Sequence, residues 1–293
     1  MAGDAHRARR REAPGGDERD RVEDRRASRR LRAQLAVRAR EWAATTRLPS
    51  YESLGNPPTV LFEAVSDGSR HGNFHDLSWR EIQAHPGWAK RLLKPHQRKS
   101  ALPEGKRRSA RELDSSNSSD ALLMNCFCFP DAPRSILAAL SLPATMDLPE
   151  FGYHPRLPLN DGGKEKTEID MRLGALLVEA KLTEEDFTVR PKTHVLRYRD
   201  LLTVFYVDAL PGDDSRFSGY QLIRNVLAAA QDQATFVALI DARRPDLLEE
   251  WKAVSAAIRD GSLRNRCGVR TWQECAAAAP PELRSFLETK YGL

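Results

Sequence analysis

The chain has 293 residues with 41% hydrophobic and 30% charged side chains, a composition typical of a soluble globular protein with some solvated segments. This length accommodates one large domain or a core domain with an appendage, and no apolar run approaches the roughly 18 residues that a membrane span requires. The net charge of +5 favours polyanionic partners only weakly.

The first thirty residues mix both charge signs and almost lack large apolar side chains. They have no apolar centre, which excludes a secretory signal, and they cannot bury enough surface to offset the entropy of ordering. We therefore predict a disordered charged tail over residues 1–30. The interleaved acids favour a solvated tail over a basic arm that binds DNA.

Residues 31–110 are predicted to form a helical or mixed N-terminal extension. Apolar spacing predicts an amphipathic helix over 31–46, and an apolar run predicts a short strand over 59–65. A further helix is expected to open with the capping-box pattern at Ser78. The basic stretch 90–111 is either a solvated surface or a contact for phosphate, and the second reading gains weight if a nuclease site follows.

Residues 111–293 are predicted to form the core domain. Two helices come first, a stretch rich in proline then lacks regular structure, and strands alternate with helices up to the C-terminus. This order predicts an α/β (α+β) fold in which helices flank a mixed sheet. The expected elements are helices over 120–129, 134–142, 219–233, 247–258 and 281–290, and strands over 167–173, 176–182, 235–241 and 268–273.

Four cysteines are present, and two of them, Cys126 and Cys128, lie inside an apolar run where free cysteine behaves as a small buried side chain. Their spacing matches zinc sites poorly. The simplest inference is a reducing, cytoplasmic compartment.

The most informative stretch is the predicted hairpin over residues 167–182. Glu179 and Lys181 occupy alternate positions of an otherwise apolar strand, so both project to one face, roughly 7 Å apart. Gly174 and the alanine after it provide a tight turn. This turn can bring Asp170 of the preceding strand beside Glu179 and Lys181.

Two carboxylates that converge on one point bind hard divalent cations such as Mg²⁺. A neighbouring lysine can position a metal-bound water or stabilise developing negative charge, and such a set suffices to hydrolyse a phosphodiester. The alternative is a structural role, in which a cross-strand ion pair keeps this face of the sheet hydrated. The cost of burying charges in so apolar a strand argues against that alternative.

Asp170, followed by Glu179-Ala-Lys181 on the next strand, resembles the signature of the PD-(D/E)xK nuclease superfamily, whose members have a restriction-endonuclease-like fold. Three further segments are similar to a family of bacterial restriction endonucleases within it, and the resemblance runs from about residue 110 to the C-terminus. These segments are Ser118-Ser-Asp-Ala-Leu-Leu-Met-Asn125, Gly219-Tyr-Gln-Leu-Ile-Arg-Asn225 and Lys290-Tyr-Gly-Leu293. Ile169 departs from the proline that gives the motif its name.

The resemblance implies a metal-dependent endonuclease that acts on DNA. Asp170, Glu179 and the carbonyl of Ala180 would bind Mg²⁺, with Mn²⁺ as a substitute, and Lys181 would activate water or stabilise the transition state. Gln221 would support this set from the following helix.

The same helix supplies expected substrate contacts, namely Tyr220, Arg224 and Asn225, although core packing is an equal alternative for Tyr220 and Asn225. Glu168 shares a strand face with Asp170 and is a candidate extra acid. Two other functions stay open: a catalytically silent DNA-binding or scaffold protein, and a nuclease that acts on RNA or branched DNA. The sequence leaves the oligomeric state open, a homodimer included.

Overall fold

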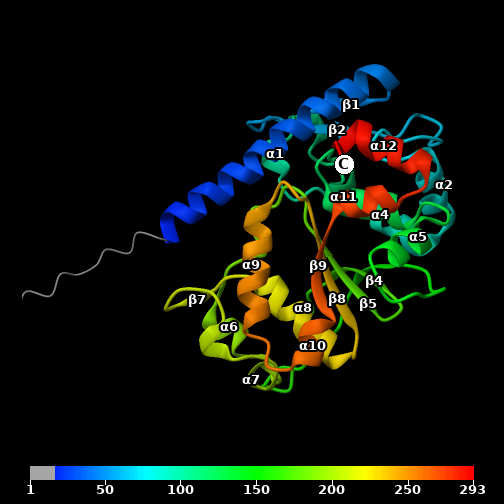
Figure 1. The fold of residues 1–293 in the computed structure, drawn as a ribbon. Helices are drawn as coiled ribbons and strands as arrows, with labels where there is room; N and C mark the ends of the chain where they lie inside the picture. Colours follow the sequence, from blue (N-terminus) through cyan, green and yellow to red (C-terminus); the bar gives the residue numbers. More distant parts are fainter. Residues whose placement is uncertain (1–16) are drawn as a thin grey trace, which may run out of the picture.

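The computed structural model describes residues 17–293, with side chains from residue 26 onward, and it is built around a five-stranded mixed sheet (Figure 1). The sheet has the order β3-β4-β5-β8-β9. Strands β3, β4 and β5 pair antiparallel, whereas β5, β8 and β9 run parallel. The predicted α/β fold with a mixed sheet is thereby confirmed. The strands are β3 (Glu150–Tyr153), β4 (Ile169–Leu173), β5 (Leu176–Ala180), β8 (Thr235–Ile240) and β9 (Cys267–Thr271).

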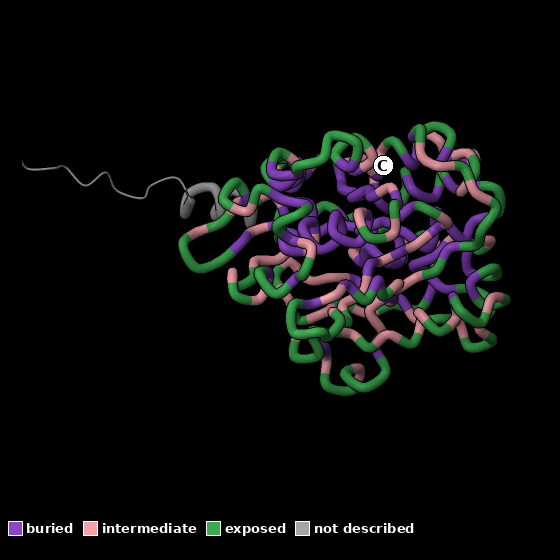
Figure 2. The backbone as a smooth tube through the Cα atoms, turned by 90° about the horizontal axis from the view of Figure 1, so that it is seen from below, coloured by how far each residue is buried: buried purple, intermediate pink, exposed green. Residues whose placement is uncertain are grey.

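Helices cover both faces of this sheet, which explains why β5 is buried at all five positions. Leu177 packs into the apolar cluster formed with α8 and α9, whereas Leu176 and Val178 pack into the cluster formed with α4, α5, α11 and α12. The buried backbone accordingly runs through the centre of the molecule (Figure 2). The covering helices are α4 (Ser119–Phe127), α5 (Ala132–Ala139), α8 (Tyr220–Gln231), α9 (Pro245–Ala256), α11 (Trp272–Ala278) and α12 (Pro281–Tyr291).

Smaller elements surround this core. Those before the sheet are α1 (Asp17–Thr46), β1 (Ser50–Glu52), β2 (Val60–Phe62), α2 (Asp76–Ala84), α3 (Pro86–Arg91) and three 3₁₀ turns, η1 (Lys99–Ala101), η2 (Glu104–Lys106) and η3 (Glu112–Asp114). Those within the second half are β6 (Arg190–Pro191), α6 (Lys192–Val195), α7 (Leu201–Val204), η4 (Val207–Ala209), β7 (Arg216–Phe217) and α10 (Gly261–Asn265). Within residues 17–293, no helix combines the length and the apolar character that crossing a membrane requires.

Helix α1 ties the N-terminal extension to the C-terminal end of the chain. Leu31 and Leu35 join the apolar cluster that contains Leu287 of α12. Arg38 Nη1 donates to the carbonyl of Glu288 at 3.2 Å. The extension and the core are therefore held together by apolar burial as well as by polar contacts.

Helix α1 starts earlier than predicted. The helix begins at Asp17 and not at residue 31, so residues 17–30 are helical, whereas residues 1–16 lie outside the described residues. Ser28 shows how this segment packs, since it is 2% exposed and its hydroxyl donates to the carbonyl of Thr183 at 2.7 Å. Small side chains let the helix approach the core, a contact that local composition does not reveal.

Strand β3 and helix α11 are among the elements that the sequence did not predict, and helix α2 begins at a different residue than expected. Strand β3 pairs only with β4, and Pro149 just before it is tolerated because a strand at the sheet edge needs fewer ladder bonds. Helix α11 starts directly after β9, where Thr271 and Glu274 form a capping box. Helix α2 begins at Asp76 with His75 as its cap, whereas Ser78 is buried inside the helix.

Lys290 is a buried amine at the junction between the extension and the core. Its Nζ donates to the side-chain oxygen of Asn73 and lies 2.8 Å from the hydroxyl of Tyr291. Asn73 Nδ2 in turn donates to the carbonyls of Leu113 at 2.5 Å and Ser115 at 2.8 Å, in the segment that leads into α4. Burial lowers the pKa of Lys290 well below its usual value.

We expect Lys290→Met to change how stability depends on pH. Because the pKa of Lys290 is lowered on folding, the unfolded state binds the extra proton at any pH between the lowered pKa and the usual value of 10.5. In that window the free energy of unfolding of the wild type should rise relative to the variant by about 1.4 kcal/mol per pH unit. Urea unfolding of both proteins at about pH 8 and about pH 9 measures this, and an unchanged difference would contradict a neutral buried amine.

Candidate active site

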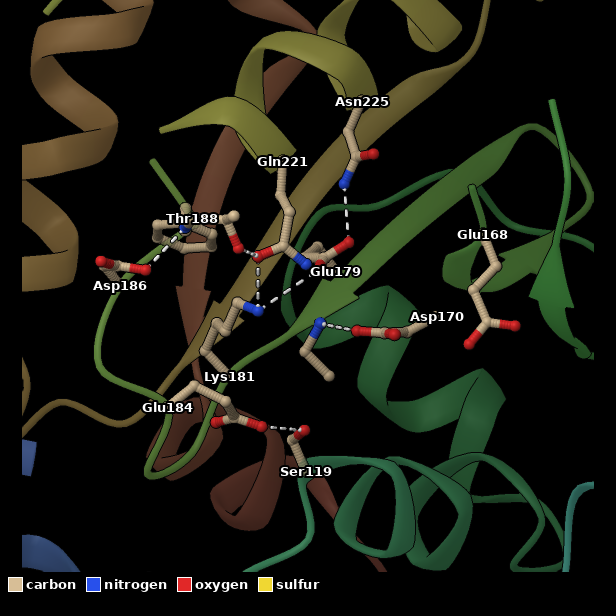
Figure 3. Close-up of polar contacts among 12 residues, drawn as sticks. Ser119, Glu168, Asp170, Glu179, Lys181, Glu184, Asp186, Thr188, Gln221 and Asn225 are labelled. Carbon is tan, nitrogen blue, oxygen red and sulfur yellow. Dashed lines mark hydrogen bonds and ion pairs between the residues drawn. The ribbon is translucent and has the colours of Figure 1, made fainter. Parts of the chain in front are cut away.

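An open cleft of about 780 Å³ lies at the carboxyl end of β5. Asp170, Glu179, Lys181 and Gln221 line it, and Figure 3 shows the last three joined by hydrogen bonds and an ion pair. The cleft is bounded by α4 on one side and by α8 with the loop 184–188 on the other. The structure thus brings together the four side chains that the sequence selected as a catalytic set.

Asp170 reaches this cleft from β4, across the turn of the hairpin. Its Oδ2 accepts a hydrogen bond from the backbone N–H of Ala180 at 2.8 Å. Burial, followed by the charges of Glu179 and Asp120, raises the pKa of Asp170 well above its usual value. Asp170 therefore lies in a region of excess negative charge.

Glu179 is the most enclosed acid of the site, with 1% exposure. Its Oε2 accepts from Asn225 Nδ2 at 2.8 Å and from Arg224 Nη2 at 3.3 Å. Its Oε1 accepts from Gln221 Nε2 and lies 3.3 Å from Lys181 Nζ. Each oxygen of this carboxylate consequently has two donors, which is enough to offset the cost of burying its charge.

Lys181 is held as an ammonium group. Its Nζ donates to Gln221 Oε1 at 2.9 Å, and its main-chain carbonyl accepts from Trp272 Nε1 at 2.8 Å. Burial alone would lower the pKa of Lys181, but the carboxylates of Glu179 and Glu184 outweigh it, so that the pKa is raised. Lys181 is therefore suited to donate a hydrogen bond and to stabilise negative charge, and poorly suited to accept a proton.

The position of Gln221 depends on the start of α8. Gly219 precedes the helix with φ 67°, a left-handed conformation, and a Cβ there would lie 2.8 Å from Val254 Cγ2. Glycine thus allows α8 to begin close to α9. Thr188 Oγ1 donates to Gln221 Oε1 at 3.0 Å and fixes the amide from the opposite side.

The expected substrate contacts on α8 face inward. Arg224 and Asn225 are 3% and 0% exposed, and both point to Glu179. The hydroxyl of Tyr220 lies 2.9 Å from that of Tyr198, within the apolar cluster under the helix. Arg224 and Asn225 thus hold Glu179 in place, Tyr220 packs in the core, and contact of all three with substrate stays a prediction.

Glu168 is bound by cations outside the catalytic set. Arg91 Nη1 lies 3.0 Å from both oxygens of Glu168, and Lys94 Nζ lies 3.3 Å from Oε1. The same two cations bind Asp120 of α4, at 2.8 Å and 3.1 Å. Glu168 is therefore already neutralised, which weakens its case as an extra metal ligand.

Sequence reasoning missed several acids of the cleft, Asp120 and Glu184 among them. Asp120 is 5% exposed and contributes to the raised pKa of Asp170. Glu184 Oε1 accepts from Ser119 Oγ at 2.6 Å, and its Oε2 accepts from the N–H of Leu182 at 2.6 Å. Asp120 lay inside a segment that the sequence had singled out, but only the tertiary fold shows that it faces Asp170.

The oxygen atoms of the site suit a hard divalent cation, provided that Glu179 gives up one of the hydrogen bonds that it accepts. No group of three His, Cys, Asp or Glu side chains is arranged as a metal site in the described part of the chain, so the side chains offer two carboxylates. Burial and the neighbouring acids disfavour the ionised form of Asp170, and a bound cation would stabilise that form. Glu179 can join only if it exchanges one of its donors, and Gln221, which is partly exposed, can give way most readily.

The mixed sheet with this hairpin defines a restriction-endonuclease-like α/β protein. A family described as "Restriction Endonuclease associating with ARP" matches residues 38–292, and the chain belongs to this family. No curated protein and no solved structure matches the chain. The resemblance to bacterial restriction endonucleases is confirmed, and it extends well before residue 110, where the sequence-based resemblance began.

We expect Asp170→Asn to stabilise the metal-free protein. Asparagine keeps an acceptor for the N–H of Ala180 and removes a carboxylate whose pKa is raised by burial and by Glu179. A carboxyl group with a raised pKa favours the folded state at low pH, and this contribution is lost as the pH rises through the folded-state pKa. In a chelator at about pH 8, the midpoint of thermal unfolding should be roughly 2–8 °C higher in the variant, and the gain should shrink toward about pH 4.

The matched control is Asp67→Asn, in an exposed turn where the N–H and hydroxyl of Ser69 lower the pKa of the carboxyl group. This control should not gain stability at about pH 8. An equal gain in both variants would show that removal of any negative charge suffices.

Proposed function

We propose that this protein is a Mg²⁺-dependent nuclease that hydrolyses phosphodiester bonds of DNA. The observation that carries the proposal is the convergence of Asp170, Glu179 and Lys181 in one open cleft at the end of β5. Membership of a restriction endonuclease family supports both the reaction and the substrate. An endonuclease fits this family best, and Mn²⁺ is the expected substitute metal.

The proposed role of each residue in the cleft follows from its charge. Asp170, Glu179 and the carbonyl of Ala180 would hold the ion, which when bound would lower the pKa of a water molecule and neutralise charge on the phosphate. Lys181 keeps its proton on Nζ and would donate a hydrogen bond to the attacking water or to a phosphate oxygen. Gln221, fixed by Thr188, keeps Lys181 in place when it releases Glu179.

A catalytically silent DNA-binding or scaffold protein is the second candidate, and one observation favours it. Both oxygens of Glu179 are fully occupied by protein donors, an arrangement that needs no metal. Calorimetric titration with Mg²⁺ and Mn²⁺ separates the two functions. Binding that is lost in Asp170→Asn supports the nuclease, whereas no binding in the wild type supports the silent protein.

The nuclease proposal predicts metal-dependent cleavage. Purified protein should nick or cut plasmid DNA with Mg²⁺ or Mn²⁺ and not with a chelator. Asp170→Ala should lower the rate at least about a hundredfold, since a metal ligand is lost, while Asp67→Asn should keep the wild-type rate. Full activity of Asp170→Ala would overturn the assignment of this site.

The nucleic acid that is cleaved, the cellular location and the oligomeric state each need a separate test. A digestion panel of double-stranded, single-stranded, branched and methylated DNA, together with RNA, would define the nucleic acid and separate endonuclease from exonuclease cleavage. Cytoplasmic location and assembly as a homodimer stay predictions. In the described structure all four cysteines are free and buried.

A further inference from the structure

A second groove continues the catalytic cleft toward the N-terminal region. It has a volume of about 380 Å³ and runs between α1, the loop 53–61 and the N-terminus of α4. The two hollows are continuous, because the same five residues line both of them. These are Gln97, Arg98, Glu112, Ser119 and Glu184.

Two guanidinium groups in this groove lack anionic partners. Arg32 donates through Nη2 to the carbonyl of Thr183 at 3.1 Å, and its buried Nε has no partner among the described residues. The Arg98 side chain is exposed and makes no hydrogen bond or ion pair within the described part of the chain. Both side chains line this groove, and burial, followed by the charge of Arg98, lowers the pKa of Arg32.

The acids of the groove do not neutralise this pair. Glu112 lies 3.2 Å from Lys94 Nζ. Glu184 is held by Ser119 Oγ and by a backbone N–H. The charges of Glu185 and Glu184 raise the pKa of Arg32 but do not offset burial and Arg98, so the pKa stays lowered. The N-terminus of the nine-residue helix α4 adds partial positive charge on the same side.

The groove is adjacent to the reacting centre. Thr183, which binds Arg32, follows Lys181 by two residues, so their Cα atoms lie at most about 7 Å apart. Thr183 also accepts a hydrogen bond from Ser28, so α1 is fixed directly beside the catalytic segment. An anion between Arg32 and Arg98 would therefore lie next to a phosphate bound in the cleft.

We propose that Arg32 and Arg98 form a phosphate-binding subsite that receives the DNA backbone beside the scissile phosphate. A backbone phosphate there would pair with both guanidinium groups and remove the repulsion between them. The subsite rests on the proposed nuclease function and adds the direction in which the substrate strand leaves the cleft. It also assigns the N-terminal extension to substrate binding.

The test measures DNA binding without cleavage. Fluorescence anisotropy in a chelator compares the wild type with Arg98→Glu, using a labelled duplex and a labelled single strand at several salt concentrations. Arg108→Glu is the matched control, because Arg108 is exposed in the same basic segment but lines neither hollow. Arg32→Met, checked for an unchanged thermal unfolding midpoint, is the second variant.

Arg98→Glu should weaken binding at least about tenfold, and the slope of log K against log salt should fall by about 0.7–0.9 for the lost phosphate contact. Arg108→Glu should change the affinity no more than about twofold. Equal effects of Arg98→Glu and Arg108→Glu would overturn the subsite, and wild-type plasmid cleavage would then show that the nuclease function stands. Selective binding of an RNA oligonucleotide would overturn the assignment to DNA, and failure of the wild type to bind or cleave DNA would refute function and subsite together.

Discussion

The charge on Glu179 is the constraint on which the rest of the site depends. This carboxylate is almost completely removed from water, and isolating it there would cost several kcal/mol. One of its four donors is Lys181, directly after β5, and the other three come from α8, so the helix can dock on the sheet in only one register without leaving the charge unpaired. Burial of apolar side chains brings α8 to the sheet, and the hydrogen bonds and ion pairs of Glu179 determine where on the sheet the helix docks.

Asp170 differs from Glu179 in that neighbouring negative charges outnumber the donors to its carboxylate. It has one backbone donor and two neighbouring carboxylates, so its ionised form is disfavoured in the structure as described. One acid of the site is thus fully compensated by protein groups and the other is not. This asymmetry is consistent with the proposed Mg²⁺ site, in which the stabilising charge would come from outside the protein.

The sequence predicts the parts of the fold that have a local signature. The hairpin was found because Glu179 and Lys181 interrupt an apolar run at a period of two, and α8 because its apolar residues repeat at helical spacing. Strand β3 and the cleft acid Asp120 were missed because each depends on a partner distant in the chain. The cap at His75 is local, since its Nδ1 accepts from the N–H of Leu77, but Ser78 offered the stronger capping-box pattern. Asp120 lies beside Asp170, fifty residues later, and no local pattern records that proximity.

The hydrogen bond from Trp272 to the carbonyl of Lys181 joins positions 91 residues apart. The catalytic segment is also fixed by Leu239, and the extension is fixed by Lys290 near the end of the chain. During synthesis, the acids of the hairpin would therefore leave the ribosome well before the C-terminal residues that fix their positions. On the proposed function, the site would become complete only when the last helices dock, so a partly synthesised chain would not yet hydrolyse DNA.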